Sequence, residues 1–155
     1  MQPVNEWLDE YGESHQNATN KFLHWICVPL IVLSLVGLLW SAPVPAVFEQ
    51  VSPLMNWGTL FMLAALVYYF IMSFTLAIGM VFVTGAMVAL LVWMDGLNVP
   101  LWQLSIGIFV VAWIGQFIGH AIEGKRPSFF KDLQFLMIGP IWLLSALYRK
   151  VGIPL

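Results

Sequence analysis

Apolar residues form long runs along this chain, and short polar segments separate them. A helix that crosses a bilayer needs about 20 mostly apolar residues, and four runs approach that length. We predict four spans, at 22–40, 57–72, 74–94 and 101–120. A fifth apolar run, 133–148, is shorter and contains Gly139-Pro140, so we expect it to tilt, kink or lie partly in the interface.

The middle of the chain is the hardest part to divide. No charged residue lies between Glu49 and Asp95, and this stretch is too long for one span and suits two. We place the turn near Ser73, although the composition hardly changes there. The segment 95–100 has the composition of a turn and separates the third and fourth spans.

A different pattern precedes the first span. Apolar and ring-bearing residues fall on one helical stripe: Val4, Trp7, Leu8, Tyr11 and His15. Acidic residues fall off that stripe: Glu6, Asp9, Glu10 and Glu13. The pattern predicts an amphipathic helix within residues 1–20, on the cytoplasmic surface or against the end of the bundle. Because the helix is acidic, packing against protein explains it better than attraction to anionic lipid.

Composition excludes most other classes. The chain is 61% apolar and 9% charged, with net charge −2, and its mean hydropathy is +0.87. Soluble domains average about 25% charged residues, so we expect an all-α polytopic integral membrane helix bundle. It would form one domain over 1–155, with its transmembrane helices inside 22–148. The net charge argues against nucleic acid as a partner, and the polar, acidic start does not resemble a cleavable signal peptide.

Orientation follows from the basic residues. Lys21 precedes the first span, whereas Lys125, Arg126 and Lys131 follow the fourth. The segments 41–56 and 95–100 contain no Lys or Arg, so the positive-inside rule places the N-terminus in the cytoplasm. Arg149 and Lys150 agree only if the fifth run enters the membrane and returns. The membrane would be the inner membrane in a bacterium, or the endoplasmic reticulum in a eukaryote.

This topology brings the three histidines to one membrane face. His15 and His24 lie before and at the start of the first span, and His120 lies at the end of the fourth. Glu123 follows His120 by three residues and shares its helix face, a spacing that offers two metal ligands from one helix. Imidazoles with a carboxylate suit iron and leave coordination positions open.

Two amides lie one helical turn from these histidines. Asn20 precedes His24 by four residues, and Gln116 precedes His120 by four. Side chains that hydrogen-bond a metal-bound imidazole fix its tautomer and orientation. We therefore expect both amides to support the histidines.

Simpler explanations stay open for each group. The histidines could be interfacial anchors, and Glu123 could pair with Lys125 or Arg126 in solvent. The basic cluster could reflect topology alone. The chain has no Gly-rich phosphate loop, no Gly-x-Ser-x-Gly elbow and no Cys-x-x-Cys pair.

Two sequence blocks resemble a known family. Residues 11–30 read YGESHQNATNKFLHWICVPL, and residues 113–127 read WIGQFIGHAIEGKRP and continue as SFFKDLQFLMIGPIWLL. Together they resemble the Mpo1-like family, across roughly the first 30 and last 40 residues, and the second block is similar to the bacterial branch. Small departures are Gly124 between Glu123 and Lys125, and Ser128 after Pro127.

The resemblance implies an Fe(2+)-dependent membrane dioxygenase. Such an enzyme uses O2 to shorten 2-hydroxy fatty acids by one carbon, with release of CO2. The resemblance implies that the catalytic metal ligands are His15, His24 and His120, with Glu123 as a further candidate. Asn20 and Gln116 would surround them, and Lys125 and Arg126 would neutralise the substrate carboxylate.

Other classes compete with this assignment. A non-enzymatic membrane lipid-binding protein could hold an anionic lipid with the same basic residues. A transporter fits less well, because no ion-coupling residue lies at mid-membrane. A bis-histidine haem protein would place its histidines deeper in the bundle than these are expected to lie.

Overall fold

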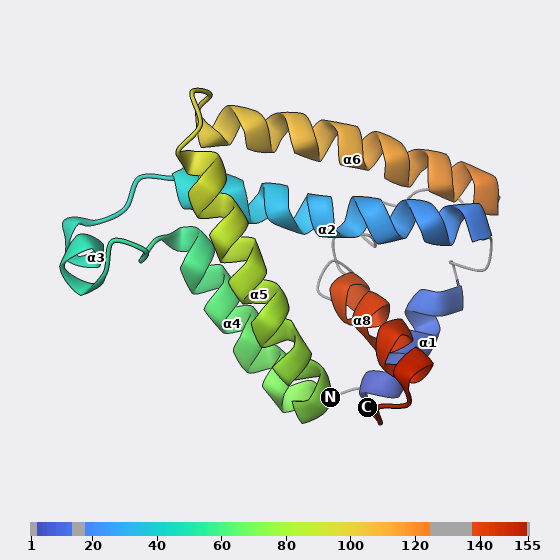
Figure 1. The fold of residues 1–155 in the computed structure, drawn as a ribbon. Coiled ribbons are helices and arrows are strands. Elements are labelled where there is room, and N and C mark those ends of the chain that lie inside the picture. The colour runs from blue at the N-terminus through green and yellow to red at the C-terminus, as the bar shows by residue number, and fades with distance from the viewer. Residues whose placement is uncertain (1–2, 14–17, 125–137, 155) are drawn as a thin grey trace.

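The fold is built from a pair of long apolar helices and a helical hairpin that crosses the pair at a steep angle. The computed structural model describes residues 3–13, 18–124 and 138–154, and within these ranges it contains seven helices and no strand. The two longest helices, α2 (Ala18–Ser41) and α6 (Leu101–Glu123), lie antiparallel and side by side (Figure 1). The hairpin of α4 (Trp57–Met72) and α5 (Phe74–Asp95) crosses them steeply.

The all-helical class is confirmed for the described residues. Three helices, α2, α5 and α6, are long and apolar enough to cross a membrane, and α4 is a shorter apolar helix. The bounds of all four agree with the predicted runs to within a few residues. Four complete crossings stay a prediction, because α4 has only 16 residues.

The division between α4 and α5 falls at the predicted turn. Ser73 follows α4 and precedes α5, and its hydroxyl accepts a hydrogen bond from the backbone N–H of Leu76 at 3.4 Å. At the other end of α4, Asn56 and Thr59 form a reciprocal capping box. The Thr59 N–H donates to Asn56 Oδ1 at 3.0 Å, and the Asn56 N–H donates to Thr59 Oγ1 at 2.9 Å. Both bonds satisfy amides that the helix start would leave without partners.

The segment between α2 and α4 contains a short helix that the sequence pattern does not predict. This helix, α3, spans Ala46–Val51 after Pro45. The indole N–H of Trp57 donates to the carbonyl of Pro43 at 2.9 Å, and its ring contacts Phe48. The segment is therefore folded onto the start of α4.

The N-terminal helix and the last helix pack together. Helix α1 (Val4–Glu13) lies in the region where the stripe was predicted, and it contacts α8 (Ile138–Val151). Leu8 is buried in a cluster with Ile138 and Ile141, so packing against protein accounts for this part of the stripe. The side chains of Trp7, Tyr11 and Glu10, and all of His15, lie outside the described residues, as do residues 133–137 of the fifth run.

Candidate functional site

The site begins with the close approach of α2 and α6. Gly115 faces Cys27, where an added Cβ would stand 2.5 Å from the sulfur, and an added Cβ on Gly119 would clash with the side-chain oxygen of Asn20. Glycines at these positions let the two backbones approach closely, as small residues do between membrane helices. The same Gly119 Cβ would stand 3.7 Å from Cε1 of His24, so the close approach occurs beside that histidine.

His24 is buried and held in one tautomer. Its side chain is 1% exposed, and its Nδ1 lies 2.9 Å from the backbone carbonyl of Asn20. A carbonyl oxygen can only accept a hydrogen bond, so Nδ1 must donate the proton. In the neutral ring, Nε2 then carries the lone pair that a metal ion requires.

His120 lies next to His24 across the α2–α6 interface. The two ring centroids are 5.9 Å apart, and the ring planes are nearly perpendicular at 86°. His120 is 6% exposed, and both of its nitrogens are buried. Bonds from imidazole nitrogen to a metal are about 2.0–2.1 Å long, so rings this close can share one ion.

Gln116 adds a buried amide one turn before His120. Its side chain is 6% exposed, and its Oε1 has no hydrogen-bond partner among the described residues. A buried acceptor without a partner costs about 1–3 kcal/mol. This cost is removed if a ligand or an ordered water donates to Gln116.

The hydrogen bond described between Asn20 and His24 comes from the backbone. The sequence suggested that the Asn20 side chain supports His24, and that role stays a prediction, whereas the Asn20 carbonyl accepts from Nδ1 of His24. The carbonyl of residue i−4 is within reach of a histidine ring in any helix, so this bond does not require asparagine. The Asn20 side chain packs against Gly119.

The other predicted site residues cannot be placed beside this pair. His15, Lys125 and Arg126 lie outside the described residues, as does the side chain of Glu123. In the part of the chain that is described, no three His, Cys, Asp or Glu side chains come together as metal ligands would. The described part of the site therefore contains two buried imidazoles and the Gln116 oxygen, and His24 is held in one tautomer. These groups fit a non-haem metal ion whose further ligands come from other residues.

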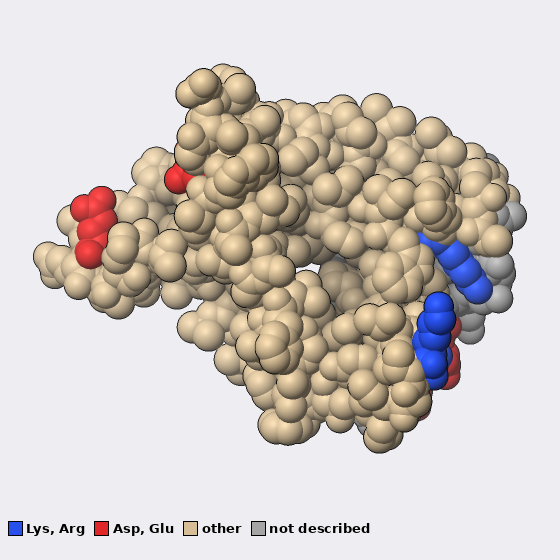
Figure 2. Space-filling model, in the orientation of Figure 1, with Lys and Arg blue, Asp and Glu red and all other residues tan. Residues whose placement is uncertain are grey.

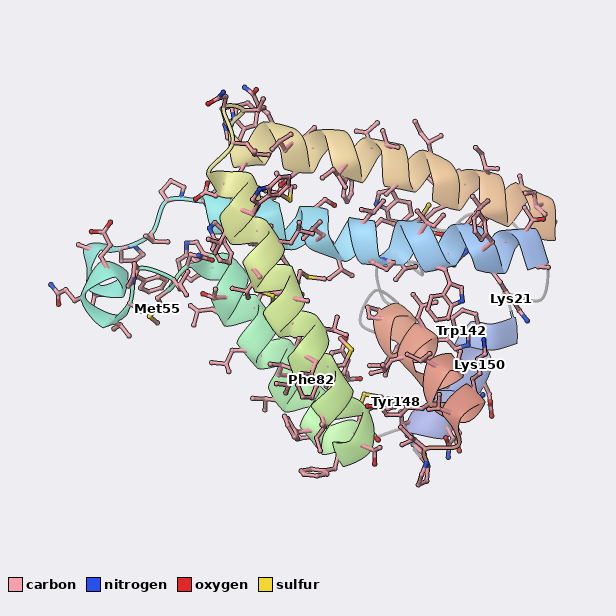
Figure 3. The ribbon with its side chains drawn as sticks, viewed as in Figure 1. Lys21, Met55, Phe82, Trp142, Tyr148 and Lys150 are labelled. Atoms are coloured by element: carbon pink, nitrogen blue, oxygen red, sulfur yellow. The ribbon has the colours of Figure 1, made fainter. Side chains whose placement is uncertain are left out.

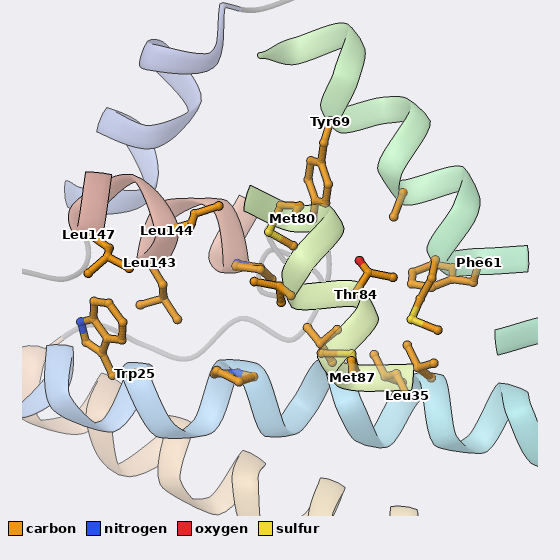
Figure 4. A pocket seen from close by; sticks show the side chains of 17 residues that line it. Trp25, Leu35, Phe61, Tyr69, Met80, Thr84, Met87, Leu143, Leu144 and Leu147 are labelled. Atoms are coloured by element: carbon orange, nitrogen blue, oxygen red, sulfur yellow. The ribbon is translucent and has the colours of Figure 1, made fainter. Parts of the chain in front are cut away.

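An apolar cavity of about 260 Å³ lies on a neighbouring face of α2. Side chains from α2, α4, α5 and α8 line it (Figure 4). Trp25 and Leu147 lie at one end, and Phe61 and Leu35 lie at the other. Its lining includes neither His24 nor His120.

Sequence reasoning expected a groove for an acyl chain but did not identify its walls. One available signal was the spacing of Trp25, Pro29, Val32 and Val36, which places them along one stripe of α2. Pro29 also lacks the N–H that would bond to the Trp25 carbonyl, and such a gap bends a helix.

On the face shown in Figure 2, basic side chains gather at one end of the fold, acidic atoms lie beside them, and other acidic side chains lie at the opposite end. The three described cations are Lys21 at the start of α2 and Arg149 and Lys150 at the end of α8. Lys21 and Lys150 lie at the same end of the fold, near Trp142 (Figure 3). Glu49 and Asp95 belong to α3 and the end of α5, at the other end.

Comparison with known proteins identifies a relationship over nearly the whole chain. The family model described as "2-hydroxy-palmitic acid dioxygenase Mpo1-like" matches residues 1–151. The chain is 24% identical over 147 residues to a Saccharomyces cerevisiae protein named 2-hydroxy-palmitic acid dioxygenase MPO1, covering 94% of this chain and 79% of the yeast protein. No solved structure matches the chain.

Proposed function

This chain belongs to the Mpo1-like family, and from that premise we propose that it is a membrane dioxygenase that oxidises 2-hydroxy fatty acids with Fe(2+). The name of the yeast relative supports the reaction class and the substrate class. We further propose that the N-terminus and the metal site face the cytoplasm, because the described cations lie at the end of the fold that carries the histidines.

One observation carries the proposal, namely the buried pair of His24 and His120. Two imidazoles 5.9 Å apart, one with its Nε2 lone pair directed by a bond at Nδ1, suit a metal centre. In this proposal, His15 and Glu123 complete the ligand set. When bound, Fe(2+) would supply coordination positions for O2 and substrate and the redox chemistry of the reaction.

The protein's own residues have four tasks in this proposal. The Asn20 carbonyl holds the His24 ring in a metal-binding tautomer, and the close packing of α2 against α6 keeps bulk water from the pair. The Gln116 Oε1 accepts a hydrogen bond from the substrate hydroxyl or a bound water. Lys125 and Arg126 neutralise the substrate carboxylate.

The overall reaction balances without another reductant. A 2-hydroxy acid and one O2 give the acid one carbon shorter, one CO2 and one water. The bond between C1 and C2 breaks, C1 leaves as CO2, and C2 becomes the new carboxyl carbon.

The experiment combines metal analysis with product analysis on the same preparations. Protein purified in detergent without oxygen should contain non-haem iron and give no Soret band, and it should convert 2-hydroxypalmitate to the shorter acid. His24→Ala and His120→Ala should each lose the iron and the product. Cys27→Ala is the matched control, because Cys27 is buried at the same interface, and it should keep both. Iron and turnover that persist in both histidine variants would refute the proposal.

The lipid-binding alternative has the apolar cavity in its favour. It predicts that the wild-type protein binds a fatty acid but contains no iron and releases no CO2. The same preparations therefore distinguish a binding protein from an enzyme.

A further inference from the structure

We propose that the apolar cavity between α2, α4, α5 and α8 binds the acyl chain of a long-chain carboxylic acid, and that Lys21 and Lys150 attract the carboxylate at one end. The identification of this acid as the 2-hydroxy fatty acid substrate rests on the proposed function. The binding site itself rests on the cavity and the cations.

The cavity has the shape and lining of a site for an alkyl chain. Its wall on α2 runs from Trp25 to Val36, which is about 16 Å at the rise of an α-helix. Hydroxyl groups in the lining come only from Tyr69 and Thr84. A polar ligand would lose its hydrogen bonds to water and regain few of them here.

The volume excludes the other common occupants of a membrane groove. A helix with side chains is about 10 Å across and does not fit in 260 Å³. Apolar cavities of this kind exclude water and bind apolar molecules. A single alkyl chain from a lipid is small enough for this volume and apolar enough for this lining.

Two cations mark one end of the cavity. Lys21 precedes Trp25 by one helical turn, and Lys150 follows Leu147 by three residues, so each cation lies on the helix surface next to a lining residue. Figure 3 shows both lysines at one end of the fold, and Figure 4 shows Trp25 and Leu147, which lie one turn from these lysines in sequence, at one end of the cavity. An apolar cavity with cations at one end is complementary to an anionic single-chain lipid.

The described carboxylates at this end do not pair with the two lysines. Helix α1 packs on α8 and carries Glu6 and Asp9, which are exposed. Among the described residues, neither carboxylate forms an ion pair with Lys21 or Lys150. Both lysines are themselves exposed, so their ammonium groups are accessible to a ligand.

The position of the carboxylate connects the cavity to the histidine pair. His24 immediately precedes Trp25 and lies one turn after Lys21. An acid bound with its tail toward Phe61 would have its carboxyl carbon and C2 at the histidine-bearing end of α2. This arrangement adds Lys21 and Lys150 to Lys125 and Arg126 as cations that attract the substrate carboxylate.

The first test locates the acyl chain in the wild-type protein. The full chain, without added iron, is placed in nanodiscs of neutral phosphatidylcholine with a palmitate analogue that carries a diazirine at its methyl end. After irradiation, mass spectrometry should find the label within 61–69 of α4 or 80–87 of α5. Label confined to the exposed face of α6, such as Val111, would overturn the proposal.

The second test fills the cavity. Ala65→Phe adds a ring to the lining, and we expect labelling and palmitate affinity to fall by about tenfold or more. Ala64→Phe is the matched control, because Ala64 is the exposed neighbour on the same helix, and it should match the wild type. Equal effects in both variants would contradict the proposal. If Ala65→Phe does not fold, the positions labelled in the wild-type protein test the proposal on their own.

The third test examines the cations. Replacing both Lys21 and Lys150 with Gln should weaken palmitate binding about three- to tenfold, the range for two exposed ion pairs, and should not weaken binding of hexadecanol. Arg149→Gln is the control, because Arg149 is two residues from Leu147 and lies on another face of α8. Equal losses for the acid and the alcohol would refute the role of the cations.

These tests separate the two proposals. Correct labelling without iron or product would refute the dioxygenase and leave the binding site. Wild-type turnover of 2-hydroxypalmitate by Ala65→Phe would refute the binding site and leave the dioxygenase.

Discussion

The two faces of α2 differ in what they bury and how tightly they are packed. The face toward α6 carries Asn20 and His24 and is packed so closely that an added Cβ on Gly119 would clash. The neighbouring face carries Trp25 and Val36 and borders an open apolar cavity. One helix therefore contributes to a packed polar centre and to an unfilled apolar site.

The cost of burying polar groups explains why they occupy the packed face. A buried polar group without a partner costs about 1–3 kcal/mol. Close packing fixes the positions of the neighbouring groups that serve as its hydrogen-bond partners. An apolar wall has no such requirement, and it loses only dispersion contacts when a space stays unfilled. The polar centre and the cavity lie at the same level of α2, because His24 and Trp25 are adjacent in sequence.

The largest effect is expected when a side chain is added where α2 and α6 are packed most closely. Gly119→Ala places a Cβ against the Asn20 oxygen, and overpacking of this kind typically costs about 1–3 kcal/mol. We expect a lower free energy of unfolding in detergent and a loss of bound iron, because the His24–His120 separation must change. Gly107→Ala is the control, since an added Cβ there meets nothing within 4 Å. It should be neutral or stabilising by about 0.5–1 kcal/mol.

A double variant sharpens the same test. Asn20→Ala removes the atoms that the new Cβ meets, while the backbone carbonyl that holds His24 is retained. The pair Asn20→Ala with Gly119→Ala should therefore lose less stability than the sum of the two single changes, with a coupling of about 0.5–3 kcal/mol. Strictly additive losses would show that Gly119 and Asn20 do not determine the approach of α2 to α6.

Much of the fold could be predicted because each helix reflects local sequence. The apolar runs and the turn residues between them predicted α2, α4, α5 and α6. The boundary between α4 and α5 also falls at Ser73, where the turn was predicted. His24 and His120 were expected to lie on one membrane face, and a metal ion shared between them requires α2 and α6 to be neighbours, as they are in the structure. The short helix α3 was not expected, because six residues bounded by prolines carry too little periodicity.

The site was predicted less completely than the fold. The partner of His24 is a backbone carbonyl, which no side-chain pattern could reveal. The cavity depends on how closely four helices approach one another, and the sequence of any one helix does not contain that information. Lys21 and Lys150 lie far apart in sequence, so only the packing of α2 near α8 brings them to one end of the cavity.

The next comparison uses a position away from both faces of α2. Asn56→Ala removes one of the two hydrogen bonds of the α4 capping box and leaves the Thr59 amide without its acceptor. Loss of such a cap costs about 1 kcal/mol, measurable by denaturant titration in detergent. Iron content should not change, because Asn56 lies beside the C-terminal end of α2, whereas His24 lies near its N-terminal end. A loss of iron equal to that of Gly119→Ala would show that the metal site responds to general destabilisation.

The smallest effect is expected at the α8 wall of the cavity. The Tyr148 hydroxyl donates to the Thr75 carbonyl at 2.9 Å and thereby ties α8 to the first turn of α5. Tyr148→Phe keeps the ring, and the Thr75 carbonyl can still accept from the helix, so the loss should lie at the lower end of the usual range, about 0.5 kcal/mol. Tyr68→Phe on α4 is the control, because the Tyr68 hydroxyl has no hydrogen bond to a described residue. We expect Tyr148→Phe to weaken palmitate labelling more than iron binding, because α8 borders the cavity and does not contribute to the His24–His120 pair. The opposite order would mean that the two faces of α2 are not independent sites.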